Sequence, residues 1–170
     1  MIIEYLKKIG LLLVLVSIQV LVLNQIHIFG YATPIIYIYV LLKLPPDISR
    51  NSLLLWGFSS GLIIDLFSNT PGMNAAACTV LALLLPQIRS LYAPKGDVEL
   101  VEAGIHSMGV SFFAKYLFTA ILVHHFVLLL IEAFTFFDIT LLLLRIGSST
   151  LLSFALILAI DMLSKRKRIA

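Results

Sequence analysis

The apolar positions of this chain fall into six long runs that are separated by short polar stretches. The runs cover residues 9–29, 31–44, 53–67, 73–91, 105–133 and 139–163. A helix that crosses a membrane needs about 20 apolar residues, with a range of about 17–25. The pattern therefore predicts an all-α integral membrane protein with six transmembrane helices, organised as a single multi-pass domain over residues 1–170.

Two of the runs, 31–44 and 53–67, are short for complete crossings. As a helix, residues 53–67 would rise only about 22 Å. Two arrangements are open for this pair of runs: short helices in a locally thin region, or a re-entrant hairpin. A hairpin would leave Lys43 and Arg50 inside the membrane or on its outer side, whereas basic side chains prefer cytoplasmic loops. We therefore favour six crossings.

The basic residues predict the orientation. If the N-terminus lies in the cytoplasm, the outer loops contain no Lys or Arg, and the cytoplasmic side receives the basic residues Lys7, Lys8, Lys43, Arg50, Arg89, Lys95, Lys165, Arg166, Lys167 and Arg168. The last four residues of this set form the only basic cluster, and they predict an anchor at the anionic cytoplasmic membrane surface rather than a nucleic-acid contact. Both termini are expected in the cytoplasm.

Composition excludes a soluble protein. The chain is 61% hydrophobic and 12% charged, whereas soluble domains are about 45–50% apolar and about 25% charged. So few charges could not cover a soluble surface. Cys78 is the single cysteine, so an intramolecular disulfide and a multi-cysteine metal site are both excluded.

The segment Gly57-Phe58-Ser59-Ser60-Gly61 matches G-x-S-x-G, the nucleophile elbow of hydrolases. That elbow works only on a strained turn from a strand to a helix, and here the residues lie inside an apolar helical run with no strand pattern before them. The G-x-S-G pattern of rhomboid-like proteases is not matched either, because Ser60 replaces the second glycine. We expect no enzymatic activity, no cofactor and no metal.

The same glycines fit a helix-packing pattern. Gly57, Gly61 and Asp65 are spaced i, i+4 and i+8, so they form one stripe along a helix, and glycines let a second helix approach closely. Pro71 and Gly72 belong to a turn that makes runs 53–67 and 73–91 an antiparallel hairpin. The stripe is predicted either to pack within this hairpin or to receive a partner helix.

Ten of the twelve basic residues lie at the borders of the apolar runs; Lys115 and Arg145 are the exceptions, and Asp65 is their acidic counterpart. A charge within the membrane costs about 2.5–3.5 kcal/mol on insertion scales, so each should face the protein interior and be paired. Similar depth predicts that Asp65 pairs with Arg145, with Lys115 as the second choice. Glu132 and Asp138 are alternative partners for Arg145. We favour a structural ion pair over a proton relay, since a relay needs several titratable groups in a chain.

His124 and His125 are adjacent, so on a helix they point about 100° apart and lack the i, i+4 spacing of a metal-binding helix. A packing role is the better interpretation of both.

A more specific pattern covers residues 10–90. Pro34 lies in the first turn of the second run, Leu44-Pro45 ends that run, and G-F-x-x-G-L-x-x-D-L begins at Gly57, with Gly72 beyond it. On these residues the chain resembles the rod shape-determining protein MreD family. The resemblance implies a non-catalytic scaffold of the bacterial cell-elongation (Rod) complex in the cytoplasmic (inner) membrane. It also implies as partners MreC, a RodA-type glycosyltransferase, a class B penicillin-binding protein and, directly or through these, MreB filaments.

The MreD family is in turn similar to the six-helix substrate-binding subunits of energy-coupling vitamin transporters. This similarity implies an alternative function, that of a small-ligand, vitamin-type membrane binding subunit. Such a subunit needs a deep polar pocket that opens outward. The outer loops are short and poor in polar residues apart from Asn24, Gln25, His27 and Asn69. This favours the scaffold, although Asp65 and Arg145 could line such a pocket.

Overall fold

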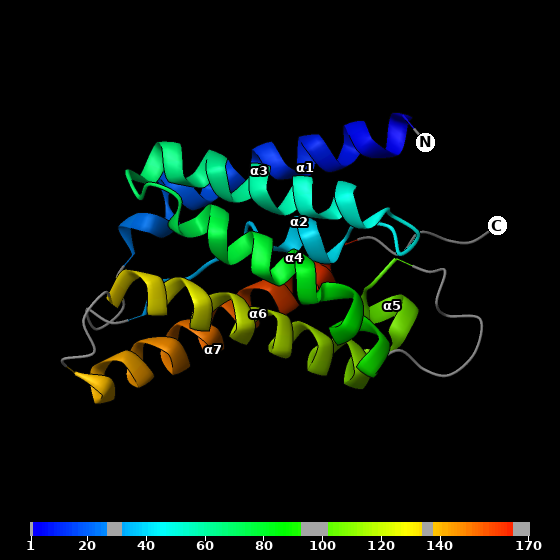
Figure 1. The fold of residues 1–170 in the computed structure, drawn as a ribbon. Coiled ribbons are helices and arrows are strands. Elements are labelled where there is room, and N and C mark those ends of the chain that lie inside the picture. The colour runs from blue at the N-terminus through cyan, green and yellow to red at the C-terminus, as the bar shows by residue number, and fades with distance from the viewer. Residues whose placement is uncertain (1, 27–31, 93–101, 134–137, 165–170) are drawn as a thin grey trace.

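The computed structural model describes residues 2–26, 32–92, 102–133 and 138–164 (Figure 1). Five helical stretches within them are long and apolar enough to cross a membrane. They contain α1 (Ile2–Leu21, continued by the 3₁₀ turn η1, Leu23–Gln25), α3 (Arg50–Ser68), α4 (Met73–Tyr92), α6 (Val110–Ala133) and α7 (Ile139–Leu163). Two short helices, α2 (Tyr39–Leu42) and α5 (Ile105–Met108), complete the described elements. Their number, length and apolar composition are those of a multi-pass membrane protein.

The long helices pack in the order of the chain. α3 packs chiefly against α4, α4 against α6 and α6 against α7, while α1 lies beside α3 (Figure 1). α1 begins and α7 ends at the same end of the bundle, which we call the terminal end; α3 and α6 finish at the opposite end (Figure 1).

The prediction of a helix over residues 31–44 is wrong. Residues 32–36 are non-helical, and only Tyr39–Leu42 form a helix, of four residues. Pro34 disfavours a helical conformation of the residue before it, and the β-branched and aromatic residues that follow favour extended structure. This stretch, which we call the buried segment (residues 32–44), runs through the interior, and every residue from 34 to 42 is buried.

A buried non-helical backbone needs hydrogen-bond partners, because an unpaired buried N–H or C=O is costly. Side chains of the flanking helices α1 and α7 supply them. The bonds are Thr33 N to Ser149 Oγ at 3.1 Å, Ile35 N to Ser153 Oγ at 2.8 Å, Ile36 N to Gln19 Oε1 at 2.9 Å, and Gln19 Nε2 to Pro34 O at 2.9 Å. Residues far apart in the sequence therefore hold the buried segment in place.

The remaining boundaries follow local rules. α3 is longer than the run 53–67, because Ser49 caps it by accepting a bond from Ser52 N at 3.2 Å. Its 19 residues rise about 28 Å, enough for a crossing. The run 105–133 is split between α5 and α6 at Gly109, whose φ is +79°, a conformation that glycine adopts readily. α4 and α7 match their predicted ranges to within one residue.

Candidate functional site

Gly57 and Gly61 lie on the face of α3 that is in close contact with α4. A Cβ added at Gly57 would lie 2.8 Å from the Cys78 carbonyl oxygen. One added at Gly61 would lie 2.3 Å from the Asn74 carbonyl oxygen and 2.5 Å from Ala75 Cα. Only glycine permits this spacing. The stripe therefore packs inside the hairpin, and the alternative of an open groove for a partner helix is wrong.

Asp65 is 4% exposed and caps α4. Its Oδ1 accepts bonds from Asn74 N at 3.0 Å, Asn74 Nδ2 at 3.0 Å and Thr70 Oγ1 at 2.8 Å. Its Oδ2 accepts a bond from Ala75 N at 2.9 Å. The first N–H groups of a helix have no partner within it, and the helix dipole favours a negative charge there. The carboxylate thus locks the start of α4 against the end of α3.

The turn between these helices has the predicted form. Asn69 ends α3 in the left-handed conformation, with φ 54°, and Gly72 has φ +80°. Pro71 lies between them and cannot continue the helix. Pro71 and Gly72 therefore serve the reversal of the chain that lets Asp65 reach α4.

The predicted pairing of Asp65 with Arg145 or Lys115 is wrong. The N-terminus of α4 compensates the carboxylate, and Arg145 Nη2 instead lies 2.7 Å from Glu132 Oε1, joining the end of α6 to the start of α7. Lys115 is exposed near the start of α6, and the described part of the chain offers it no ion pair. Its long side chain is suited to reach the membrane surface. Lys165, Arg166, Lys167 and Arg168, the predicted anchor, lie outside the described residues.

The two adjacent histidines face different neighbours. The Tyr37 hydroxyl donates to Asn74 Oδ1 at 2.8 Å and lies 3.0 Å from His124 Nε2. His125 Nδ1 lies 2.9 Å from the Ile121 carbonyl oxygen, and its Nε2 lies 3.3 Å from Ser153 Oγ. His124 thus joins α6 to the buried segment, and His125 joins α6 to Ser153 of α7. Among the described residues, no group of three or more His, Cys, Asp or Glu side chains is placed to hold a metal ion.

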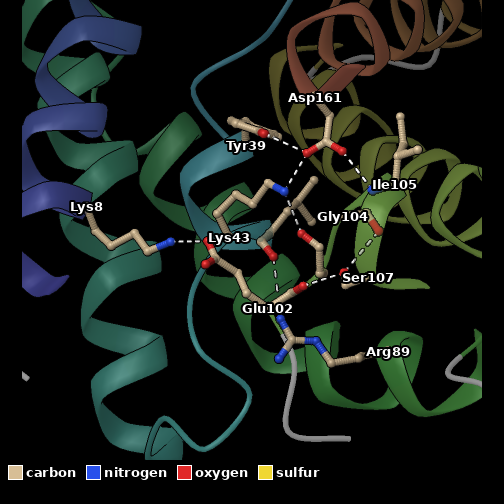
Figure 2. Close-up of polar contacts among 11 residues, drawn as sticks. Lys8, Tyr39, Lys43, Arg89, Glu102, Gly104, Ile105, Ser107 and Asp161 are labelled. Atoms are coloured by element: carbon tan, nitrogen blue, oxygen red, sulfur yellow. Dashed lines mark hydrogen bonds and ion pairs between the residues drawn. The ribbon is translucent and has the colours of Figure 1, made fainter. Parts of the chain in front are cut away.

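A buried ion pair at the terminal end was not foreseen from the sequence. Lys43 Nζ lies 2.5 Å from Asp161 Oδ1 and donates to the Ala103 carbonyl oxygen at 2.7 Å (Figure 2). Asp161 is 2% exposed. It also accepts bonds from the Tyr39 hydroxyl at 2.7 Å and from Ile105 N at 2.8 Å. The sequence does contain a signal for this ion pair, because Asp161 is the only acid in the apolar run 139–163 and Lys43 is the only charged residue in the run 31–44.

Further contacts at the terminal end tie α1 and α4 to the same region. Lys8 forms an ion pair with Glu102 (Figure 2). Arg89 Nη2 donates to the Leu42 and Leu44 carbonyl oxygens at 3.4 Å and 3.1 Å. The Arg89 bonds thus pair carbonyl groups at the end of the buried segment.

A polar pocket of about 450 Å³ lies at the opposite end of the bundle. The end of α1, the start of the buried segment, the α3–α4 hairpin and the ends of α6 and α7 that meet there all contribute to it. Its polar lining includes Gln19, Asn24, Gln25, Thr33, Glu132 and Arg145. Of the two charges expected in such a pocket, Arg145 lines it and Asp65 does not.

No family model matches this chain, and neither does any curated protein or solved structure.

Proposed function

We propose that the chain is a non-catalytic membrane scaffold of the bacterial cell-elongation (Rod) complex. The observation that supports this is the pattern G-F-x-x-G-L-x-x-D-L with Gly72, on which the resemblance to the MreD family rests. Its glycines face α4 at contact distance, and its aspartate caps α4. The glycines and the aspartate of the pattern thus build the fold, as expected of a family related by a shared architecture and not by a catalytic site.

The proposed topology has six crossings with both termini in the cytoplasm, and the buried segment is the second crossing. Thirteen helical residues would rise only about 20 Å, but non-helical residues can rise about 3.3 Å each, so a partly non-helical segment can approach the membrane core of about 30 Å. Non-helical backbone is tolerated at membrane depth where protein surrounds it, which the buried segment satisfies.

Charge supports the orientation. Lys8, Lys43 and Arg89 lie in one region at the terminal end (Figure 2), where α3 begins at Arg50, whereas Arg145, near the start of α7, is the only basic residue of the opposite end within the described ranges. Basic residues favour the cytoplasmic side. The terminal end is therefore the cytoplasmic end in our proposal, and the membrane is the bacterial inner membrane.

The proposed partners are MreC, a RodA-type glycosyltransferase and a class B penicillin-binding protein, with MreB filaments reached directly or through them. Because α4 fills the groove at Gly57 and Gly61, the single span of MreC would have to contact another surface. The outward stripe Leu55, Phe58 and Leu62 of α3 is exposed and lies on one helix face.

The test is depletion of the chain in its own cells, followed by cysteine crosslinking to MreC. We expect depleted cells to become round, and cysteines at Leu55 or Phe58 to crosslink to MreC in a Cys78→Ala background. A cysteine at Ile64, which is 2% exposed, is the matched control on the same helix. Cells that keep their rod shape on depletion would contradict the scaffold. Crosslinks confined to other helices would exclude α3 as the contact surface.

The second candidate function is that of a small-ligand, vitamin-type membrane binding subunit, and the polar pocket favours it. Its volume of about 450 Å³ falls within the range of about 300–1,000 Å³ typical of ligand sites. The test is native mass spectrometry of the full chain purified in a mild detergent. A stoichiometric small molecule that stays bound supports this function, and a chain that retains none under any growth condition contradicts it.

A further inference from the structure

The pocket has one feature that distinguishes among ligands, which is the ion pair between Glu132 and Arg145 in its lining. These two residues are the only charged ones that line it within the described residues. Their side chains are 42% and 28% exposed. Exposed ion pairs contribute only about 0–1 kcal/mol, so the pair can be rearranged by a ligand at little cost.

The neutral polar groups of the pocket are largely occupied with one another. Gln19 Nε2 donates to Asn24 Oδ1 at 2.9 Å, and Asn24 Nδ2 donates to Ser68 Oγ at 2.8 Å. Gln19 also holds the backbone of the buried segment. A ligand that captured these amides would release buried backbone groups, which is unfavourable. The Gln19 and Asn24 amides therefore form a fixed wall, and we assign specific recognition to the charged pair.

Both residues of the ion pair retain hydrogen-bonding capacity. The contact joins one guanidinium nitrogen to one carboxylate oxygen. A guanidinium has five N–H donors, and a carboxylate has a second oxygen with its own lone pairs. One anion can thus be added at Arg145 and one cation at Glu132 while the two residues remain in contact. A ligand with a single charge would satisfy only one of them.

We propose that this pocket binds a small zwitterion, with its ammonium group against Glu132 and its phosphate or carboxylate group against Arg145. The proposal rests on the second candidate function, small-ligand binding, and is independent of the scaffold. Two sources share this chemistry: a free zwitterion, or the phosphoethanolamine headgroup of a membrane lipid. The pocket lies at an end of the membrane-crossing bundle, where either source can be reached.

The experiment uses the full chain in detergent micelles, titrated by calorimetry with three probes. Glycerophosphoethanolamine is the zwitterion, glycerol 3-phosphate is the anion alone, and ethanolamine is the cation alone. The variants are Glu132→Gln and Arg145→Gln. Glu102→Gln is the matched control, because Glu102 has the same 42% exposure and also belongs to an ion pair, but at the terminal end.

We expect the zwitterion to bind at least tenfold more tightly than either single-charge probe. We expect each pocket variant to weaken this binding at least tenfold, while Glu102→Gln leaves it unchanged. A second arm identifies the source: in mixed-lipid nanodiscs analysed by native mass spectrometry, retention of phosphatidylethanolamine over phosphatidylglycerol, lost in Glu132→Gln, assigns the lipid. Binding of the free probe without lipid retention assigns the free zwitterion.

Equal affinity for glycerol 3-phosphate would overturn the proposal, since it would mean a simple anion site. Zwitterion binding that survives both pocket variants would overturn it as well, as would failure of all three probes to bind. In the last case, a different stoichiometric ligand found on the purified chain would leave small-ligand binding standing while the zwitterion proposal falls.

Discussion

The contact of α3 with α4 at Gly61 predicts that even one added methyl group destabilises the protein, because that group would meet backbone atoms. In Gly61→Ala the new Cβ would lie 2.3 Å from the Asn74 carbonyl oxygen and 2.5 Å from Ala75 Cα. Backbone cannot rotate away as a side chain can. The two helices must separate by roughly 1 Å to restore an ordinary contact, and overpacking of this kind costs about 1–3 kcal/mol.

The separation has a second consequence. The displaced residues are those whose N–H groups bond to Asp65, at 3.0 Å for Asn74 and 2.9 Å for Ala75. Hydrogen bonds to a charged group contribute about 1.5–3 kcal/mol each, and lengthening weakens them. Alanine restores at most about 1 kcal/mol through its higher helix propensity. The expected net loss in the free energy of unfolding is about 2–4 kcal/mol.

Gly147→Ala is the matched control. Gly147 also lies inside a long helix, but a Cβ there meets nothing within 4 Å, so the same substitution should be neutral or should stabilise by up to about 1 kcal/mol. The measurement is reversible unfolding of both variants in mixed detergent micelles, followed by circular dichroism. If Gly61→Ala were as stable as Gly147→Ala, the close-packing argument for the hairpin would be refuted.

Three further substitutions test the interior contacts by the same unfolding measurement. Asp65→Asn replaces an acceptor of the α4 N–H groups with a partial donor and should cost about 2 kcal/mol; wild-type stability would mean that the cap is dispensable. Gln19→Leu leaves a backbone N–H and a C=O of the buried segment without partners, which should cost about 2–4 kcal/mol, and a loss below 1 kcal/mol would contradict that role. Lys43→Met leaves the buried Asp161 carboxylate unpaired and should cost about 3–5 kcal/mol. The double variant Lys43→Met/Asp161→Leu should recover much of this loss, whereas additive losses would exclude direct coupling.

Local features of the sequence were sufficient for most helices. The apolar runs 73–91 and 139–163 match α4 and α7 to within one residue, because the length of an apolar run and the ends of a helix depend on neighbouring residues alone. The split at Gly109 was not predicted, since a glycine within a helical run signals a break only when the surrounding packing favours one.

The charged residues show where local reasoning ends. Depth along the helices suggested that Asp65 and Arg145 would meet, but depth does not determine which helix faces which. The negative charge of Asp65 is instead compensated by N–H groups at the N-terminus of α4, which carry no formal charge. The ion pair of Lys43 with Asp161 joins two residues that the sequence places at the ends of separate apolar runs.

The sequence by itself thus determined that this chain is a multi-pass helical membrane protein and that α3 and α4 form an antiparallel hairpin. Only the tertiary structure decided the path of the buried segment, because its N–H groups find their partners on other helices. Ile35 bonds to Ser153, 118 residues away. Without water in the membrane, a backbone that leaves the helix is stable only where such distant side chains meet it, and sequence order does not say where they will lie.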